Sequence, residues 1–460
     1  MTPVKKTKII CTIGPACLDK DVLRRMAEAG MDCVRINCAH GNPNQWAHAI
    51  KLVRSVADVP ILIDTKGLDL RVNLKEPIEV KRGSELVFGF HDRYPAWFNH
   101  DFLRQAKLNQ SVFFSDGMIE AKIVAKDHES LHLRFTTLGE LTDHMGANVP
   151  GVRFNIPALQ KKDYENLAFA RKHRVEFVAL SFAQTPHDVF AVKKALKGSG
   201  IEVISKIENR QGVRNFDKIL AASDGIMVAR GDLGVELPQE RVPLLQKEFI
   251  RKCNAEGKVV IVATQVLESM IHKPRATRAE TSDAANAILD GADALMLSGE
   301  TAKGEFPVEA VKTLASIARA TEHAVQCTVA EGASRNVSKA IASAVATTAN
   351  MLHIDKIVVI TRSGYTARSI SRYRLRQPLL AVTSSPLVQK QLRLHYGVMP
   401  VLYHGKGEKN HILPVAKWLH SLGHIKGEEL ILFTAGRFAT QPATNMIQIN
   451  WGREVLQAEA

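Results

Sequence analysis

The sequence predicts an α/β fold: a (β/α)8 barrel with an inserted small β-domain and a C-terminal open α/β domain. Three observations lead to this prediction. Eight short apolar runs alternate with amphipathic segments, turn-rich sequence interrupts the third unit, and a second α/β pattern follows the eighth. The chain has 460 residues, enough for several domains of ordinary size.

The eight runs have the length and β-branched composition of buried parallel strands. Amphipathic segments such as residues 19–30 and 243–257 lie between most of them, and Gly257 is a typical helix stop. Eight strand–helix units favour a closed barrel. The expected strands are Lys8–Thr12, Cys33–Asn37, Ile61–Asp64, Phe177–Phe182, Glu202–Lys206, Gly225–Ala229, Val259–Ala263 and Ala294–Ser298.

The third unit is interrupted from Arg71 to about Val149 by sequence in which apolar and polar residues alternate between Gly and Asp turns. This alternation predicts a small β-domain over residues 72–150. Because loops after barrel strands form the active-site face, we expect this domain to be a lid, with residues 148–159 as its return hinge. An insertion without function is the alternative. The barrel then comprises residues 1–71 and 151–325.

A second series of strand and helix patterns predicts a separate α/β domain over residues 326–460. The polar segment 331–336 is the expected linker. Strands are expected at residues 356–361, 379–383, 398–403, 429–436 and 446–451, with helices between the first of them.

The composition is that of an ordinary globular protein, with 45% hydrophobic and 23% charged residues. No segment approaches the roughly 20 apolar residues of a membrane span, and no signal peptide is evident, so we expect a cytoplasmic protein without a membrane partner. The six cysteines form no CxxC pair and are expected to be reduced. The net charge of +14 is spread along the chain, which favours phosphorylated ligands over nucleic acid.

Charged and hydroxyl side chains follow the ends of four of the expected strands. Because the carboxyl ends of barrel strands point into one pocket, we expect these side chains to meet there. They are Lys206, Glu208, Asp232, Thr264, Ser298 and Glu300.

The residue types at these strand ends predict a metal site for an anionic substrate. Glu208 and Asp232 supply the oxygen ligands that Mg²⁺ or Mn²⁺ prefers, although surface carboxylates at helix starts are the alternative. Lys206 can stabilise charge that develops during phosphoryl transfer and on an enolate oxygen, whereas a structural salt bridge to Glu208 is the competing interpretation. Ser298 and Glu300 can form a proton relay or a helix cap.

A glycine and a threonine at the next strand ends are candidates for holding a carboxylate. Gly231 lies at the approach to a helix, where backbone N–H groups bind anions. Thr264 can hydrogen-bond the ligand, lie on a proton path, or cap a helix.

Further polar residues lie in and after the second and third strands, on the opposite side of the pocket that the strand ends form. Arginines bind phosphate in a fork-like manner, and no Walker loop is present, so side chains would hold a nucleotide here. These residues are Arg35, Asn37, His40, Asp64, Thr65, Lys66 and Arg71.

Taken together, the segments resemble the pyruvate kinase family over nearly the whole chain and in the family's order. They include TKIICTIGP, AGMDCVRINCAHG, LIDTKGLDLR, FSDGMI, KIENRQG, SDGIMVARGDLGVELP, ATQVLESM, TRAETSDAANAILDGADALMLSGETAKG and SGYTARSISRYR. The resemblance implies a barrel, a β lid and a C-terminal effector domain in a homotetramer. It also implies phosphoryl transfer from phosphoenolpyruvate to ADP, giving ATP and pyruvate in the final step of glycolysis.

The resemblance assigns roles position by position. Arg35 and Lys206 contact the transferring phosphoryl group, and Glu208 and Asp232 hold the divalent metal. The backbone of Gly231 and Asp232, with Thr264, holds the substrate carboxylate. The remaining assignments are nucleotide binding by Asn37, His40 and Arg71, K⁺ binding by Asn37, Asp64 and Thr65, and proton delivery by Ser298 and Glu300.

The chain departs from the family pattern at three places. Ala39 replaces the usual serine that helps to bind K⁺, so we expect weak K⁺ binding or a water in place of the hydroxyl. Residues 68–69 are Leu-Asp instead of Pro-Glu, and K⁺-independent members usually carry lysine at the second position. His144 and Met145 replace a basic pair beside the lid hinge.

The segment Thr361–Arg368 resembles the phosphate loop of the family's effector pocket, in which backbone and hydroxyl donors surround an anion. Its candidate ligands are Thr361, Ser363, Gly364 and Thr366, and a sugar phosphate or a nucleotide is the expected effector. Tyr365 is bulkier than the usual residue, and a purely structural loop is the alternative.

Two other functions compete with a working pyruvate kinase. A different metal–enolate barrel enzyme, such as a lyase acting on pyruvate or oxaloacetate, would need Glu208 and Asp232. It would not need Arg35, Arg71 or a lid. A non-catalytic or weakly active ligand-sensing homologue would not need the complete set of strand-end residues.

Overall fold

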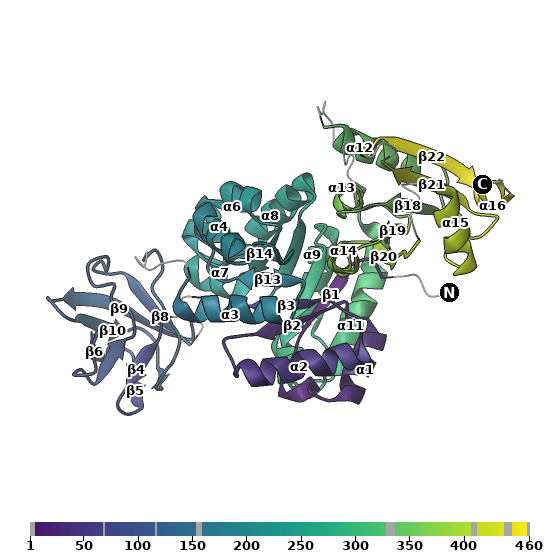
Figure 1. Cartoon of the computed structure of the whole chain (residues 1–460). Helices are drawn as coiled ribbons and strands as arrows, with labels where there is room; N and C mark the ends of the chain where they lie inside the picture. Colours follow the sequence, from purple (N-terminus) through teal and green to yellow (C-terminus); the bar gives the residue numbers. More distant parts are fainter. Residues whose placement is uncertain are drawn as a thin grey trace.

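The computed structural model describes residues 5–67, 70–115, 117–152, 159–327, 336–405, 412–436 and 444–457. It confirms the predicted fold class. Figure 1 shows the inserted β-domain at one end of the molecule, the barrel in the middle and the C-terminal α/β domain at the other end. The predictions made for residues 68–69, for most of the return hinge (153–158) and for most of the linker (331–335) concern residues outside the described ones.

Eight parallel strands close the barrel in the order β1-β17-β16-β15-β14-β13-β3-β2. Their buried residues include Ile10, Phe177 and Met227, which pack in one apolar cluster. All eight predicted strands are present. They are β1 (Lys8–Thr12), β2 (Cys33–Asn37), β3 (Ile61–Asp64), β13 (Phe177–Leu180), β14 (Glu202–Ile207), β15 (Gly225–Ala229), β16 (Val259–Ala263) and β17 (Ala294–Leu297).

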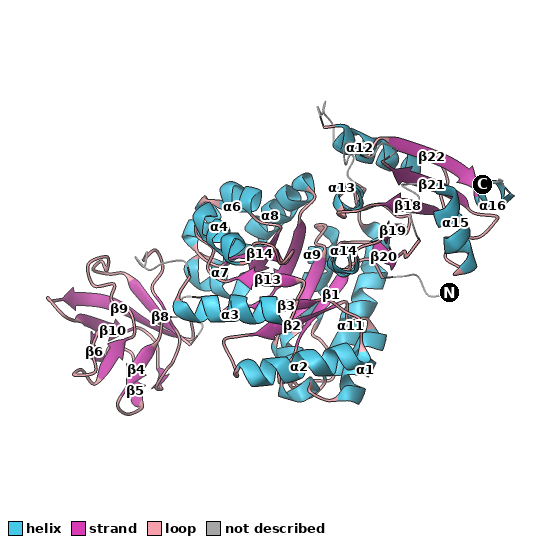
Figure 2. Cartoon of the chain, viewed as in Figure 1, coloured by secondary structure: helices cyan, strands magenta, loops and turns pink. Residues whose placement is uncertain are grey.

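Helices cover the outside of the barrel (Figure 2). Helix α8 ends where predicted, because Gly257 adopts a left-handed φ of 67° at its C-cap. The helices are α1 (Lys20–Ala29), α2 (Pro43–Val56), α3 (Lys161–Lys172), α4 (Pro186–Ala195), α5 (Arg210–Arg214), α6 (Phe216–Ala222), α7 (Arg230–Glu236), α8 (Val242–Glu256), α9 (Arg278–Leu289), α10 (Gly299–Ala302) and α11 (Pro307–Thr321).

The inserted domain between β3 and α3 consists of strands and loops (Figure 2). A seven-stranded sheet and a two-stranded sheet enclose an apolar core in which Phe98 stacks on both Phe88 and Phe114. The strands are β4 (Val72–Leu74), β5 (Ile78–Val80), β6 (Glu85–Gly89), β7 (Ala96–Phe98), β8 (Ser111–Phe114), β9 (Ile119–Lys126), β10 (Leu131–Phe135), β11 (Gly139–Leu141) and β12 (Ala147–Asn148).

The C-terminal domain has a five-stranded sheet in the order β20-β19-β18-β21-β22, parallel except for β22. Its elements are α12 (Val337–Met351), β18 (Lys356–Ile360), α13 (Tyr365–Ser371), β19 (Leu379–Thr383), α14 (Pro386–Leu392), β20 (Val398–Leu402), α15 (Ile412–Ser421), β21 (Leu430–Ala435), β22 (Met446–Trp451) and α16 (Gly452–Gln457). The domain limits given above remain predictions.

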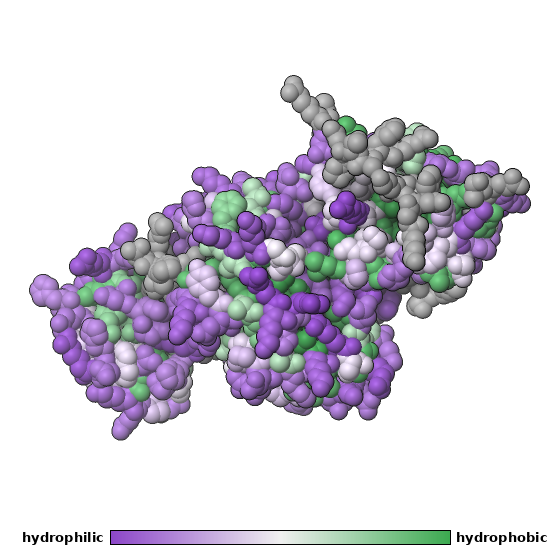
Figure 3. Space-filling model, in the orientation of Figure 1, coloured by the Kyte–Doolittle hydropathy of each residue, from purple (hydrophilic) through white to green (hydrophobic). Residues whose placement is uncertain are grey.

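Hydrophilic side chains dominate the face of the molecule in Figure 3. Among the described residues, no helix has the length and apolar character that crossing a membrane requires.

A buried ion pair joins the barrel to the C-terminal domain. The Nη2 atom of Arg374 lies 3.0 Å from the Oδ2 atom of Asp293, and both side chains are at most 3% exposed. Arg374 also donates to the carbonyl of Gly291 and to Asn254, while Asp293 accepts from the backbone N–H of Tyr396. These bonds connect the end of the barrel wall with the loop before β20.

We expect Arg374→Met to lower the free energy of unfolding by about 3–5 kcal/mol, because it leaves the Asp293 carboxylate buried without its cation. Urea unfolding measures this change. Arg24→Met is the control, since the Arg24–Asp21 pair is largely exposed and its loss costs about 0–1 kcal/mol. Equal losses in the two variants would contradict the role given to Arg374.

Candidate active site

Three charged side chains from the end of β3, the end of β14 and the residue after β14 meet at the carboxyl ends of the barrel strands. The ammonium of Lys206 lies 2.9 Å from Glu208 Oε1 and 3.2 Å from Asp64 Oδ1. Both carboxylates are only 1% exposed, and the Lys206 side chain is 12% exposed. The salt bridge between Lys206 and Glu208 is therefore real, but it is part of a larger network.

Arg35, in the middle of β2, joins this network through Asp64. Its Nε and Nη2 atoms both lie 2.7 Å from Asp64 Oδ2, and its Nη1 donates to Thr12 Oγ1 at 3.0 Å. Asp64 thus holds Arg35 and Lys206 on its two oxygens, which fixes two cations side by side.

Electrostatic interactions keep Lys206 charged despite its burial. Burial lowers the pKa of Lys206, but Asp64 and Glu208 raise it by more, so it lies above the ordinary value of 10.5. Burial raises the pKa of Asp64, but Lys206 and Arg35 outweigh burial and hold it below 3.8. At neutral pH the network therefore contains two fixed positive charges facing the barrel mouth.

Sequence reasoning missed two hydroxyl groups in this network. Ser181 accepts from Lys206 at 2.9 Å and donates to the carbonyl of Thr65 at 2.7 Å. Thr12 holds Arg35. Both residues follow or end a barrel strand, so the strand-end rule that identified Lys206 would also have identified them if applied to β13 and β1.

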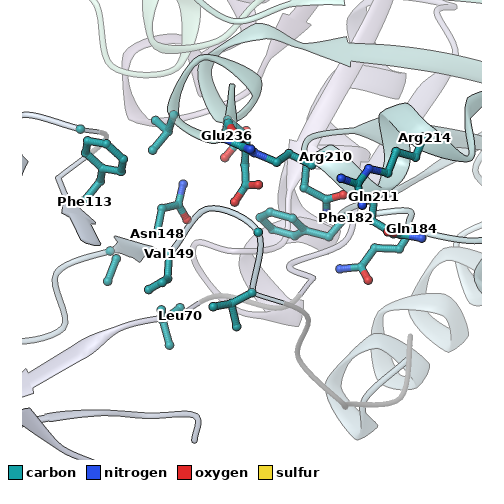
Figure 4. Close-up of a pocket in the computed structure, with 18 residues that line it drawn as sticks. Leu70, Phe113, Asn148, Val149, Phe182, Gln184, Arg210, Gln211, Arg214 and Glu236 are labelled. Carbon is teal, nitrogen blue, oxygen red and sulfur yellow. Dashed lines mark hydrogen bonds between the residues drawn. The ribbon is translucent and has the colours of Figure 1, made fainter. Parts of the chain in front are cut away.

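Glu208 and Asp232 lie on neighbouring units of the barrel, after the paired strands β14 and β15. Asp232 is near enough to Lys206 to raise its pKa, and it lines a cavity of about 250 Å³ between the inserted β-domain and the barrel. Figure 4 shows residues of the inserted β-domain, such as Phe113 and Asn148, facing Phe182 and other barrel residues across this cavity.

The donor set of these two carboxylates fits a hard divalent cation. Each carboxylate oxygen can accept more than one bond, so the contacts of Glu208 with Lys206 and with the Phe182 N–H leave lone pairs for a metal. The described residues contain no group of three or more His, Cys, Asp or Glu side chains around one metal position. Mg²⁺ is commonly bound by one or two carboxylates together with substrate oxygens and water, as this pair would require.

The backbone at Thr264 is held in a strained conformation. Thr264 and Gln265 have φ values of 66° and 52°, which are unusual for residues other than glycine, and Thr264 is β-branched. Arg230 donates to both of their carbonyls. The Gly231 N–H donates to Thr264 Oγ1 at 2.7 Å. The two candidate carboxylate binders are therefore together and hydrogen-bonded to each other.

Ser298 and Glu300 also lie together, at the start of α10. The Glu300 carboxylate accepts from the N–H groups of Ser298 and Leu267, and burial raises its pKa above the ordinary 4.5. Ser298 makes no side-chain capping bond, and its buried Oγ has no partner among the described residues. The hydroxyl therefore does not act as the helix cap that was the alternative.

The residues assigned to the nucleotide and to K⁺ lie at the ends of β2 and β3 and at the base of the inserted β-domain. Arg71 donates to the carbonyl of His144 at 2.6 Å. His40 is exposed on the loop after β2. Asn37 Oδ1 accepts from the N–H of Ala39 at 3.0 Å, and Thr65 Oγ1 donates to a carbonyl on β13 at 3.1 Å.

The loop between β18 and α13 carries the candidate effector ligands. Thr361 Oγ1 accepts from the Gly364 N–H at 3.0 Å, and Thr366 hydrogen-bonds Thr444. In the following helix, Arg368 forms an ion pair of 2.6 Å with Glu202, the first residue of β14. This pair connects the loop's helix to the strand whose other end carries Lys206.

A barrel with fixed cations and carboxylates at its mouth, an inserted β-domain and a second α/β domain defines a (β/α)8-barrel enzyme for an anionic substrate. Residues 4–311 match the family model "Pyruvate kinase, barrel domain", and residues 339–450 match "Pyruvate kinase, alpha/beta domain". Over 471 aligned positions the chain is 40% identical to the pyruvate kinases of Bacillus licheniformis and of Staphylococcus aureus strain MRSA252. Each alignment covers 97% of this chain and 80% of the relative.

The chain belongs to the pyruvate kinase family and is therefore a phosphotransferase. Membership implies phosphoenolpyruvate and ADP as substrates and a divalent metal as cofactor.

Proposed function

We propose that this chain transfers the phosphoryl group of phosphoenolpyruvate to ADP and releases pyruvate and ATP, the final step of glycolysis. The observation that carries the proposal is the network in which Asp64 holds Arg35 and Lys206 side by side at the barrel mouth. Two fixed cations at one position suit a phosphoryl group whose negative charge persists through the transfer.

In this proposal Lys206 is the principal catalytic group. Its ammonium lies over the transferring phosphoryl group and stabilises the charge on the enolate oxygen that remains. Arg35 binds the phosphoryl oxygens. Its hydrogen bonds to Asp64 and Thr12 already hold the guanidinium in place, so the side chain does not need to move during the reaction.

We assign Mg²⁺, or Mn²⁺ in its place, to Glu208 and Asp232. When bound, the cation polarises substrate oxygens as a Lewis acid. Thr264, with the backbone of Gly231 and Asp232, orients the substrate carboxylate. Because the Gly231 N–H donates to Thr264 Oγ1 in this structure, binding through this group requires a small rotation or a shared hydrogen bond.

Ser298 and Glu300 are the proposed route for the proton that converts the enolate into pyruvate. The raised pKa of Glu300 increases its protonated fraction, and the hydroxyl of Ser298, which has no partner among the described residues, lies two residues away. Asn37, His40 and Arg71 are the proposed nucleotide contacts, with Arg71 at the base of the lid.

We propose that K⁺ binds weakly to Asn37, Asp64 and Thr65. Asp64 already faces the two cations Arg35 and Lys206, and Ala39 offers no hydroxyl. Ala39→Ser is expected to lower the K⁺ concentration for half-maximal activity by about tenfold, because it adds one oxygen ligand. An activity titration measures this change, with Ala39→Cys as a control of similar size. A wild-type response as strong as that of serine-containing members would contradict the proposal.

The remaining proposals concern regulation, assembly and location. A sugar phosphate or nucleotide would bind Thr361, Ser363, Gly364 and Thr366, and the Arg368–Glu202 pair offers a route from that loop to β14. We propose a homotetramer and a cytoplasmic location, the latter in keeping with six free cysteines. The β-domain of residues 72–150 is proposed as the lid.

The test is pyruvate formation from phosphoenolpyruvate with Mg²⁺, with and without ADP. Turnover that requires ADP supports the kinase. Consumption of phosphoenolpyruvate without ADP would indicate a different reaction on the same barrel, and no turnover by folded protein would indicate a non-catalytic homologue.

A further inference from the structure

A second cavity lies at the opposite end of the barrel from Lys206. It has a volume of about 330 Å³, within the range of small-molecule sites. Its wall comes from the segment before β1, the end of α11 and two loops of the C-terminal domain. The lining residues are Lys5, Lys6, Arg319, Glu322, His323, Arg376, Pro378, Gly397 and Met399.

Positive charge dominates this wall. Lys6, Arg319 and Arg376 are cationic, and His323 can become so, whereas Glu322 is the single acidic side chain among the lining residues. Both oxygens of Glu322 are occupied, since they accept from the N–H groups of Lys6 at 2.9 and 3.0 Å and of Thr7 at 2.6 Å. Glu322 therefore anchors the start of the chain and compensates only part of the charge.

Two of the cations lack a counter-ion within the described part of the chain. Neither Arg319 nor Arg376 takes part in an ion pair there, and the buried Nε of Arg319 has no hydrogen-bond partner. A buried guanidinium N–H without an acceptor is costly, so such a group calls for an acceptor from outside the protein.

Lys6 connects the two sides of the cavity. Its ammonium donates to the carbonyl of Leu375 at 3.0 Å and to that of Arg376, both in the C-terminal domain. Its own carbonyl accepts from the N–H of Gly397 at 3.0 Å. Burial lowers the pKa of Lys6, Glu322 raises it in part, and the nearby Arg376 lowers it again, so the pKa lies below its ordinary value. An anion in the cavity would stabilise the charged form of Lys6.

We propose that this cavity, lined by Lys6, Arg319 and Arg376, binds a small oxyanion ligand through a phosphate or carboxylate group. Guanidinium groups suit both, because two parallel N–H donors match either oxyanion. The ligand would contact the barrel through Arg319 and the C-terminal domain through Arg376, and so would hold the two together. The site contains none of the residues of the Thr361–Arg368 loop, and it does not depend on the proposed reaction.

Figure 1 shows β1, α11 and β20 at the junction where this site lies. Lys8 strengthens the same junction by donating to the carbonyl of Val398 at 2.9 Å. Ligand binding should therefore slow local opening of the chain before β1 and of the loop that precedes β19.

The test is backbone amide hydrogen exchange of the full chain with inorganic phosphate, inorganic pyrophosphate or malonate. At ten times the dissociation constant we expect about tenfold slower exchange in residues 5–8 and 374–379. The double variant Arg319→Gln/Arg376→Gln should raise the dissociation constant of the probe about a hundredfold. At the same probe concentration, exchange in these segments should then be almost as fast as without the probe. The matched control, Lys312→Gln with Arg453→Gln, removes the same charge from exposed positions of α11 and α16 and should respond like the wild type.

A response to the phosphates alone assigns a phosphorylated ligand, and a response to malonate alone assigns a carboxylate. The proposal is overturned if none of the probes slows exchange in these segments at up to about 10 mM, a weak limit for a metabolite site. It is equally overturned if slowing is confined to the barrel mouth or persists in the Arg319/Arg376 variant. Since neither arginine makes an ion pair within the described residues, that variant is expected to fold, which circular dichroism checks.

Discussion

Lys206→Arg is expected to lower kcat by about 100- to 1000-fold while leaving the protein folded. Arginine keeps the positive charge that Asp64 and Glu208 need, because both carboxylates are buried against this side chain. Its planar guanidinium cannot occupy the position of a compact ammonium 2.9 Å from both Glu208 and Ser181, so the charge over the phosphoryl group is misplaced. Steady-state kinetics and thermal unfolding measure the two effects.

Lys206→Met separates the electrostatic contribution from the structural one. It removes the cation, so we expect the same or a larger loss of kcat together with a loss of about 3–5 kcal/mol in unfolding free energy. Lys193→Met is the control, because Lys193 pairs with Asp224 at 2.7 Å away from the mouth. A Lys206→Arg variant with wild-type kcat would refute the catalytic role of the ammonium.

Glu208→Gln and Asp232→Asn are each expected to raise the Mg²⁺ concentration for half-maximal activity by at least about 10- to 100-fold. Even partners outside the first coordination shell typically contribute that much to metal affinity. Each substitution keeps the size of the side chain and removes the charge that a hard divalent cation requires. Activity titrations with Mg²⁺ measure the effect, and binding of Mn²⁺ followed by electron paramagnetic resonance measures it without turnover.

Glu236→Gln is the matched control for the metal variants. Glu236 lines the same cavity as Asp232 but is not a proposed ligand. If Glu236→Gln weakens Mn²⁺ binding as much as Asp232→Asn does, the cavity's overall charge rather than a defined pair of ligands attracts the cation.

The sequence was sufficient to predict the barrel because its strands are buried on both faces. Continuous apolar runs such as Val259–Ala263 are therefore unambiguous, and the polar residue after each run marks the carboxyl end. The inserted β-domain was predicted from alternation instead, as in β9 and β10, where one face of the sheet is buried and the other is not.

Which charged side chains of the site contact one another could not be predicted in the same way. Asp64 was assigned to K⁺, but the structure places it between Arg35 and Lys206. The strands that carry Asp64 and Lys206 are separated by β13, so their contact depends on side-chain length and on the curvature of the barrel. Neither quantity follows from the periodicity of the sequence.

The contacts between the barrel and the C-terminal domain also could not be predicted from the hydrophobic pattern of the sequence. Arg374 and Asp293 are 81 residues apart, and nothing in the neighbouring sequence distinguishes them from surface charges. The same holds for Lys6 and Glu322, which meet only because the chain before β1 returns to the end of α11.

Phosphorus NMR of a mixture of phosphoenolpyruvate, ADP, Mg²⁺ and the protein tests the central claim most directly. We predict that the γ-phosphate signal of ATP appears at the rate at which the phosphoenolpyruvate signal disappears, and that Lys206→Arg slows both rates equally. Release of inorganic phosphate without formation of ATP, or loss of phosphoenolpyruvate at an unchanged rate in the Lys206→Arg variant, would contradict the account.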